Sequence, residues 1–181
     1  MSNLKELLGE GYPLREEKPT PPYKIYCDMD GVLTDFEARF EHFTGMHPQE
    51  YEKEKGLAAF WHLIDSEIGV RFWVGMDWMP QGKQLWSFIS PYKPDLLTSP
   101  SRDNTSRLGK NLWVKNNLNP KPKVIFAYSK DKQRYANESS ILIDDKKSNI
   151  NEWTARGGIA IRCKDGNVDH VIEKLKELGY E

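Results

Sequence analysis

The sequence predicts an α/β fold in which a parallel sheet lies between two layers of helices. Three observations support this prediction: short apolar runs recur along the chain, helical patterns separate them, and the runs are apolar almost throughout. Strands that are apolar on both faces are typical of parallel sheets with helices on both sides. We therefore expect a three-layer, Rossmann-like parallel sheet with a small helical cap inserted after the first strand.

The strands and helices can be placed in order. The first predicted strand, Tyr23–Cys27, follows a proline-rich lead-in. Further strands are expected at Asp95–Thr98, Val124–Tyr128, Ile141–Asp144 and Ile159–Arg162, and helices at about 105–117, 149–156 and 168–178. Gly157-Gly158 follows the second of these helices, as glycine commonly does at a helix C-terminus. The alternation of strand and helix favours parallel pairing.

The stretch between the first two strands, about 36–91, is too long for a simple crossover. Phe36, Phe40 and Phe43 recur at helical spacing, and Pro48 suits the first turn of a second helix. Further helices are expected at about 57–64 and 85–89. We divide the chain into a peripheral N-terminal arm at 1–22, a core at 23–35 and 80–181, and a helical cap at 36–79.

Composition excludes several classes of protein. The chain has 181 residues, enough for one domain with an insertion, and its net charge of −1 comes with no basic tail that would favour stable nucleic-acid binding. Cys27 and Cys163 lie in apolar runs, and we expect buried free thiols in a reducing compartment. Because no membrane span or signal peptide is visible, we expect a cytoplasmic protein with no membrane partner.

Two carboxylates, Asp28 and Asp30, stand one residue apart where the first strand runs into a turn. Side chains at i and i+2 of an extended backbone lie on the same side, and Gly31 allows a sharp turn. Two close anions favour a bound divalent cation, and oxygen ligands near phosphate suit Mg²⁺. This pattern indicates phosphoryl transfer. The alternative interpretation is a turn whose aspartates only cap the next helix.

Polar residues follow two further predicted strands. Thr98-Ser99 offers a hydroxyl and backbone N–H groups for phosphate oxygens, and Asp144-Asp145 offers further metal carboxylates. Lys132 could neutralise the phosphate and nucleophile, and Lys110 could reach back toward the anion. Each feature alone also fits an ordinary turn or a surface charge. Their order along the chain favours one common site.

Taken in this order, these elements resemble the motifs of the haloacid dehalogenase superfamily phosphohydrolases and, more narrowly, of the 5′(3′)-deoxyribonucleotidases. The matching residues are Asp28–Phe36, Leu97–Pro100, Lys110 with Trp113–Lys115, Asp131-Lys132 and Leu142–Lys146. The resemblance extends from Tyr23 to about Cys163, and the N-terminal arm has no counterpart in it.

The resemblance implies a role for each site residue. Asp28 is the expected nucleophile, and Asp30 the expected general acid and base. Mg²⁺ would be held by Asp28, the backbone carbonyl of Asp30, and one or both of Asp144 and Asp145. The expected phosphate-binding residues are Thr98, Ser99, Lys132 and Lys110, with Lys130 as an alternative to Lys132.

The aromatic cap suggests the substrate, because aromatic faces stack on nucleobases. The residues expected to bind it are Phe36, Trp61, Phe72, Trp73 and Arg102. We therefore expect a Mg²⁺-dependent nucleotidase of nucleotide metabolism, of the 5′-nucleotidase kind, that hydrolyses deoxyribonucleoside monophosphates at the 5′ or the 3′ ester. A homodimer is compatible with the sequence. The alternatives are a phosphatase for another small phosphate ester or a nucleic-acid end, and a non-catalytic nucleotide-binding scaffold.

Overall fold

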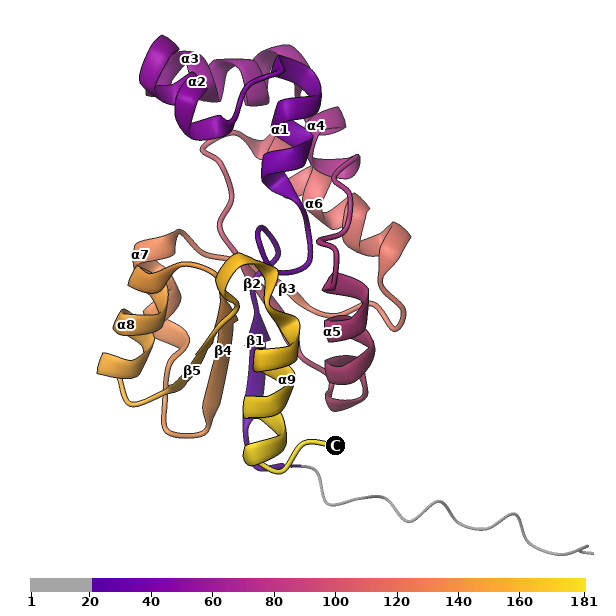
Figure 1. Ribbon diagram of the computed structural model, residues 1–181, viewed down its shortest axis with the longest axis vertical. Helices are drawn as coiled ribbons and strands as arrows, with labels where there is room; N and C mark the ends of the chain where they lie inside the picture. Colours follow the sequence, from indigo (N-terminus) through magenta and orange to yellow (C-terminus); the bar gives the residue numbers. More distant parts are fainter. Residues whose placement is uncertain (1–20) are drawn as a thin grey trace, which may run out of the picture.

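The computed structural model describes residues 21–181 and contains a five-stranded, all-parallel sheet (Figure 1). The strands are β1 (Lys24–Cys27), β2 (Asp95–Thr98), β3 (Val124–Phe126), β4 (Ser140–Asp144) and β5 (Ile159–Arg162). Their order is β3-β2-β1-β4-β5, which puts the first strand in the middle. The predicted parallel α/β fold is confirmed. Nearly all of the predicted N-terminal arm, residues 1–20, lies outside the described residues.

The sheet register aligns the ends of the central strands. Cys27, the last residue of β1, is paired with Leu96 in β2 and Ile143 in β4. Every residue of β4 is buried, as expected for a strand covered on both faces. Because the strands are parallel, their carboxyl ends meet at one edge, and the residues after β1, β2 and β4 therefore lie close together there.

Helices cover both faces of the sheet. They are α5 (Gly82–Ile89), α6 (Asn104–Asn117), α7 (Ser129–Lys132), α8 (Lys147–Ala155) and α9 (Val168–Glu177), with short 3₁₀ turns at Ser90–Tyr92, Gln133–Tyr135 and Lys164–Gly166. Figure 1 shows α7 and α8 on one side of the sheet and α5 and α9, which pack together, on the other. Helix α9 buries Val168, Val171 and Leu175 on one face, which explains its periodic apolar stripe.

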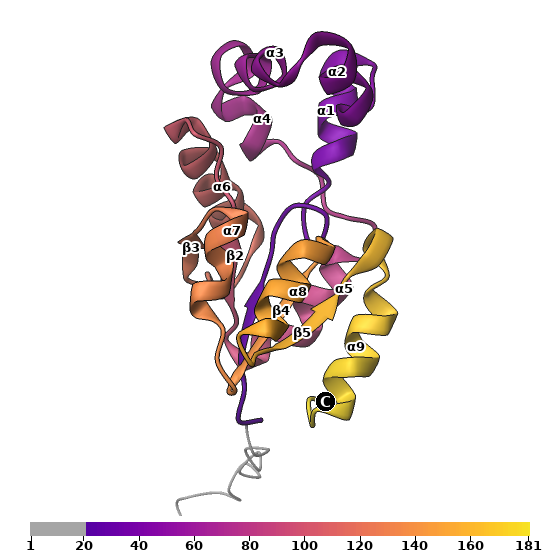
Figure 2. The ribbon, with the colours of Figure 1, turned by 90° about the vertical axis from the view of Figure 1, so that its left-hand side faces the viewer.

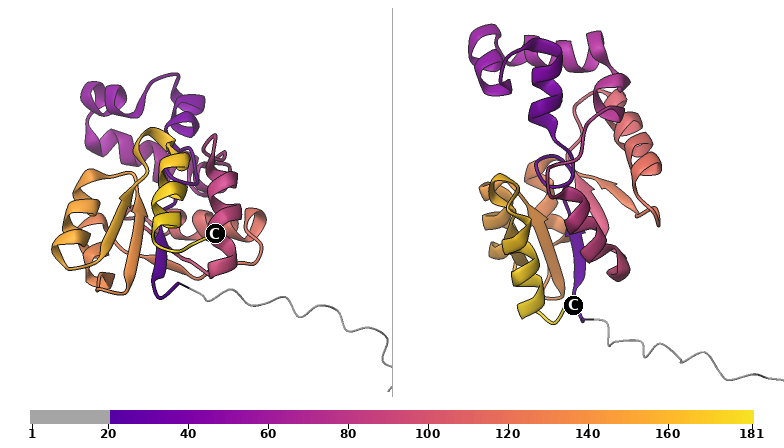
Figure 3. Two further views of the ribbon diagram at one scale, coloured as in Figure 1. Left: turned by 60° about the horizontal axis from the view of Figure 1, so that its bottom comes forward. Right: turned by 45° about the vertical axis from the view of Figure 1, so that its right-hand side comes forward.

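A separate group of helices follows β1. It comprises α1 (Phe36–Thr44), α2 (Pro48–Lys55), α3 (Leu57–His62), a π-helical segment (Leu63–Ile68) and α4 (Val70–Val74). Figures 2 and 3 show these helices beyond the carboxyl ends of the strands, with α4 beside the start of α6. The helix expected to begin at Pro48 is confirmed, whereas the π-helical continuation of α3 was not predicted. The division of the chain into core and cap stays a prediction.

The helices of this group pack through aromatic rings, and a hydrogen bond connects them to the loop after β2. The rings of Phe40 and Phe60 stack with centroids 4.8 Å apart. Asp65 in the π-helical segment accepts a hydrogen bond of 2.8 Å from the Ser101 hydroxyl, which lies in the loop after β2. This bond connects the π-helical segment to the loop that leads into α6.

The two cysteines are buried and unpaired, as predicted. Burial raises the pKa of the Cys163 thiol to about 11 and that of Cys27 well above its usual value, so both remain protonated at neutral pH. Within residues 21–181, no helix has both the length and the apolar composition needed to cross a membrane. The cytoplasmic location stays a prediction.

Candidate active site

A tight loop after β1 places the first two aspartates. Thr34 returns a hydroxyl hydrogen bond of 3.0 Å to Asp30 Oδ1, and the backbone N–H of Gly31 bonds the Thr34 carbonyl at 2.9 Å. Gly31 has φ +77°, and a Cβ there would lie 2.7 Å from Asp145 Oδ2. Glycine is therefore required both by the backbone conformation and by the close approach of Asp145.

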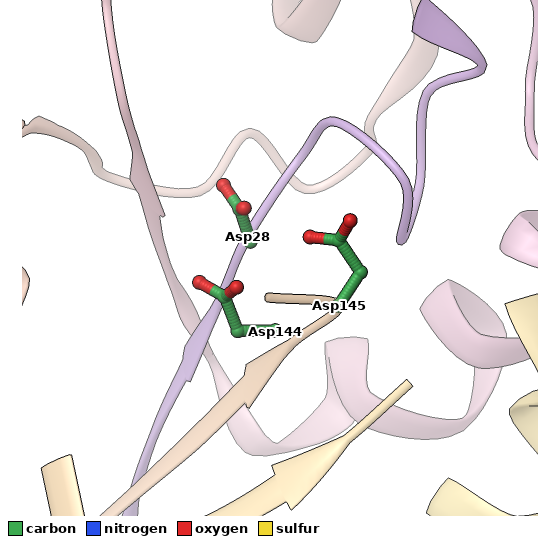
Figure 4. Close-up of side chains that lie close together, drawn as sticks. All are labelled: Asp28, Asp144 and Asp145. Atoms are coloured by element: carbon green, nitrogen blue, oxygen red, sulfur yellow. The ribbon is translucent and has the colours of Figure 1, made fainter. Parts of the chain in front are cut away.

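Three carboxylates gather at the ends of two neighbouring strands. One oxygen each from Asp28, Asp144 and Asp145 lies within 4.8 Å of the others, and Figure 4 shows these side chains at the carboxyl ends of β1 and β4. Asp28 is 7% exposed and Asp144 is completely buried. A cluster of oxygen ligands with this charge fits a hard divalent cation such as Mg²⁺. Without one, the buried negative charges repel.

Burial and mutual repulsion change the acidity of this cluster. Burial raises the pKa of Asp28, and the nearby Lys132 ammonium opposes the rise only in part. Burial, together with the charges of Asp28 and Asp144, raises the pKa of Asp145 to about 7. Carboxyl groups tuned in this way are typical of sites that bind a cation or transfer a proton.

Lys132 and Asn149 fix the buried Asp144. The Lys132 ammonium lies 2.7 Å from Asp144 Oδ2 and 2.9 Å from Asp28 Oδ2. Burial opposes the charge on Lys132, but these two carboxylates outweigh it and raise its pKa. The Asn149 side chain in α8 donates to both Asp144 oxygens, at 3.0 and 2.9 Å. Lys132 is thus held charged beside Asp28, whereas the Lys130 side chain is exposed at the surface of α7.

Asp30 stands apart from the three clustered carboxylates. Its Oδ2 accepts a hydrogen bond of 2.6 Å from Lys110, which is completely buried. The same ammonium donates to Thr98 Oγ1 at 2.8 Å and to the Ser99 carbonyl at 2.7 Å. The two aspartates of the first loop therefore have different basic partners.

A cavity of about 1150 Å³ opens over these groups. It is lined by the predicted site residues Asp28, Asp30, Phe36, Trp61, Trp73, Ser99, Arg102, Lys132 and Asp145, and also by Lys130. The predicted residues that do not line it are Phe72, Thr98, Lys110 and Asp144. Phe72 is instead completely buried and packs edge-on against Phe36 and Trp73, with centroids 5.1 Å away in both cases. The roles assigned to these residues stay predictions.

Sequence reasoning missed several residues of the cavity wall. Asn149 is 4% exposed and lines the cavity, and Arg162 donates from Nε to the Asp145 carbonyl at 2.8 Å. Lys146 and the pair Met79-Pro80 also line it. A signal existed for Asn149, because a polar residue in the first turn of the helix after Asp144 is placed to reach back to that strand end. No such signal existed for Arg162, because this residue is only the last one of an apolar strand.

The arrangement has the parts needed for phosphoryl transfer. Asp28 lies at the cavity floor beside a charged lysine and a carboxylate pair, so an attacking oxygen and a charge-neutralising group are adjacent. Asp30 lines the same cavity and could exchange a proton with a bound ester or water. The geometry is thus compatible with covalent catalysis at Asp28.

Neither a family model nor a curated protein sequence matches this chain. Solved structures do match it. A "predicted phosphatase" from Clostridium acetobutylicum aligns with a TM-score of 0.51 and 12% identity, over 87% of this chain and 91% of that one. A "HAD family enzyme" from Bacteroides thetaiotaomicron, solved as a magnesium complex, aligns with a TM-score of 0.50 and 16% identity, over 84% and 98%. The chain therefore has the Rossmann-like fold of the haloacid dehalogenase family.

Proposed function

We propose that this protein is a Mg²⁺-dependent phosphomonoesterase that forms an aspartyl-phosphate at Asp28. One observation supports this most: Asp28 shares a cluster with Asp144 and Asp145 and pairs with the buried Lys132, while Asp30 is held separately in the same cavity. A nucleophile, a cation site and a proton donor are then within reach of one phosphate. The fold of the two solved structures is compatible with this assignment.

The chemistry runs in two displacements. In the first, a carboxylate oxygen of Asp28 bonds to phosphorus while the bond from phosphorus to the ester oxygen breaks, and Asp30 gives that oxygen a proton. In the second, water attacks phosphorus, Asp30 takes a proton from the water, and the Asp28 oxygen leaves with its electron pair. Lys132 places a positive charge beside Asp28 throughout. Mg²⁺, held by Asp28, the Asp30 backbone carbonyl, and Asp144 or Asp145, would offset charge on the phosphate oxygens.

For the substrate we favour deoxyribonucleoside monophosphates. The cavity is much larger than a phosphate group needs, and Phe36 and Trp61 contribute aromatic side chains to its wall. Trp73 also lines the cavity, but it is only 1% exposed and its ring lies against the Lys110 ammonium. Such side chains can stack on a base, which contributes about 1–3 kcal/mol for each base stacked. Arg102 also lines the cavity and is suited to an anionic or polar part of the nucleotide. The competing substrate is another small phosphate ester or a nucleic-acid end.

A panel of phosphate monoesters tests this proposal. Purified protein is assayed for phosphate release from deoxyribonucleoside 5′- and 3′-monophosphates, ribonucleotides, sugar phosphates and a 5′-phosphorylated oligonucleotide, each with Mg²⁺ and with EDTA. We expect Mg²⁺-dependent release with the highest kcat/KM on deoxyribonucleotides. Equal rates across all esters would overturn the nucleotide assignment. Nucleotide binding with no release from any ester would indicate the non-catalytic scaffold instead.

A further inference from the structure

All three N–H donors of the Lys110 ammonium are hydrogen-bonded to other groups of the protein. An ammonium group has three donors. Lys110 directs them to Asp30 Oδ2 at 2.6 Å, Thr98 Oγ1 at 2.8 Å and the Ser99 carbonyl at 2.7 Å. Its side chain is completely buried and does not line the cavity. In this arrangement no N–H of Lys110 is left to bind a transferring phosphate.

The surroundings of Lys110 hold it in this place. The Trp73 ring of α4 lies with its centroid 5.1 Å from the Lys110 nitrogen. At Gly109, the preceding residue, a Cβ would come within 2.4 Å of the Trp73 Cβ, so α6 and α4 are in direct contact there. A buried ammonium with one carboxylate partner and a fixed backbone has little freedom to turn toward another ligand.

The four aspartates at the strand ends fall into two sets. Asp28, Asp144 and Asp145 face one another closely enough to share a cation, whereas Asp30 does not belong to that group. Instead Asp30 accepts from Lys110 at Oδ2 and from the Thr34 hydroxyl at Oδ1. Each carboxylate oxygen has a second lone pair, so both contacts leave Asp30 able to carry or accept a proton.

We propose that Lys110 is a positioning residue that holds the Asp30 side chain away from the carboxylate cluster and orients it for proton transfer to the leaving group. This inference rests on the proposed function and deepens it. It assigns Lys110 to Asp30, and leaves Lys132 as the lysine that acts beside the nucleophile.

The inference predicts a dependence on the leaving group. A nitrophenolate leaves without needing a proton, whereas an alkoxide such as a nucleoside oxygen needs one in the transition state. The parameter kcat/KM reports the steps through formation of the aspartyl-phosphate, so it detects loss of the proton donor on the alkyl ester alone. A residue with a purely structural role would lower both values by the same factor.

The test compares the wild type, Lys110→Met and the control Lys115→Met, which changes an exposed lysine on the same helix. The ratio of kcat/KM for an alkyl phosphate to that for nitrophenyl phosphate is measured with saturating Mg²⁺. We expect this ratio to fall at least about tenfold in Lys110→Met, since general acid catalysis contributes roughly 10²–10⁴-fold, and to stay unchanged in Lys115→Met. Both substrates are assayed on one preparation, so partial unfolding cancels from the ratio.

Asp30→Asn provides the second arm. Its ratio should already be low, and adding Lys110→Met should leave it unchanged if Lys110 acts only through Asp30. An unchanged ratio in the single Lys110→Met variant, or a further large fall in the double variant, would overturn the inference while the proposed function stands. A wild type that hydrolyses neither ester would instead refute the proposed function, and the inference with it.

Discussion

Two parts of the molecule beside the cavity are built in different ways. We call the charged residues at the strand ends the floor and the aromatic residues of helices α1 to α4 the roof. On the floor, charged groups at the strand ends are paired over short distances, such as 2.7 Å between Lys132 and Asp144 and 2.6 Å between Lys110 and Asp30. In the roof, aromatic rings are in van der Waals contact with one another, for example Phe36 and Phe72, whose centroids lie 5.1 Å apart. Directional hydrogen bonds and ion pairs fix the side chains of the floor, whereas the side chains of the roof are held mainly by the close packing of their rings.

This difference predicts whether a substitution should change activity, stability or substrate binding. The charged groups of the floor carry the proposed chemistry and repacking of neighbours cannot replace them, so a change there should mainly abolish activity. An aromatic ring in the roof has either a packing role or a ligand role, and burial distinguishes the two. Phe72 is completely buried, whereas Trp61 is 37% exposed and lines the cavity.

The largest expected effect is at Asp28. Asp28→Asn removes the nucleophilic carboxylate and should lower kcat by at least about a thousandfold, while the fold is retained. Phosphate release and the thermal unfolding midpoint measure the two parts of this expectation. The matched control is Asp169→Asn, an exposed aspartate at the start of α9. An Asp28→Asn protein with activity near that of this control would contradict covalent catalysis at Asp28.

The second effect concerns packing in the roof. Phe72→Ala removes a completely buried ring that contacts Phe36 and Trp73, and should lower the free energy of unfolding by about 3–5 kcal/mol. For a chain of this size, that corresponds to a fall in the unfolding midpoint on the order of 10 °C. Calorimetry gives the value directly. A midpoint near that of the wild type would show that this ring is not part of the packed cap.

The third effect concerns the ligand face of the roof. Trp61→Ala should raise KM for nucleotides by roughly 5- to 150-fold, the equivalent of about 1–3 kcal/mol of stacking, and change KM for a sugar phosphate much less. The control is Phe43→Ala, because Phe43 is similarly exposed, at 39%, but does not line the cavity. Equal KM changes for both kinds of ester would argue against base stacking at Trp61.

The strand ends could be predicted from the sequence because local rules determine them. Asp28, Thr98 and Asp144 each follow or end an apolar strand, and parallel pairing brings such residues to one edge without further information. The strand bounds were therefore predicted to within about two residues. The helix at Pro48 was predictable for a similar reason, since proline suits the first turn of a helix.

The remaining features depend on tertiary contacts that sequence spacing does not show. The contacts of Lys110 with Asp30, Thr98 and Ser99 are one example, because they depend on where α6 lies in the folded chain. Phe72 and Trp73 are adjacent in sequence, yet only Trp73 lines the cavity. Which side of a short helix faces a ligand is decided by its neighbours, and composition does not reveal it.

The smallest predicted effect uses the acidity of the floor. The pKa of Asp145 is raised to about 7 by burial and by the charges of Asp28 and Asp144, whereas an unfolded aspartate titrates near 3.9. Between these values, the cation-free folded state binds more protons than the unfolded state. Its stability should therefore fall as pH rises from about 4 to about 7, and remain at the lower level above that.

Magnesium should reverse this loss, because a bound divalent cation favours the ionised carboxylates. We expect Mg²⁺ to raise the unfolding midpoint more at pH 8 than at pH 5.5, with a difference of a few degrees, about 2–4 °C for each kcal/mol. Sodium chloride at matched ionic strength controls for screening. Asp145→Asn removes one titrating group and should weaken the dependence of the magnesium shift on pH. A variant that keeps the full wild-type dependence would show that Asp145 does not cause it.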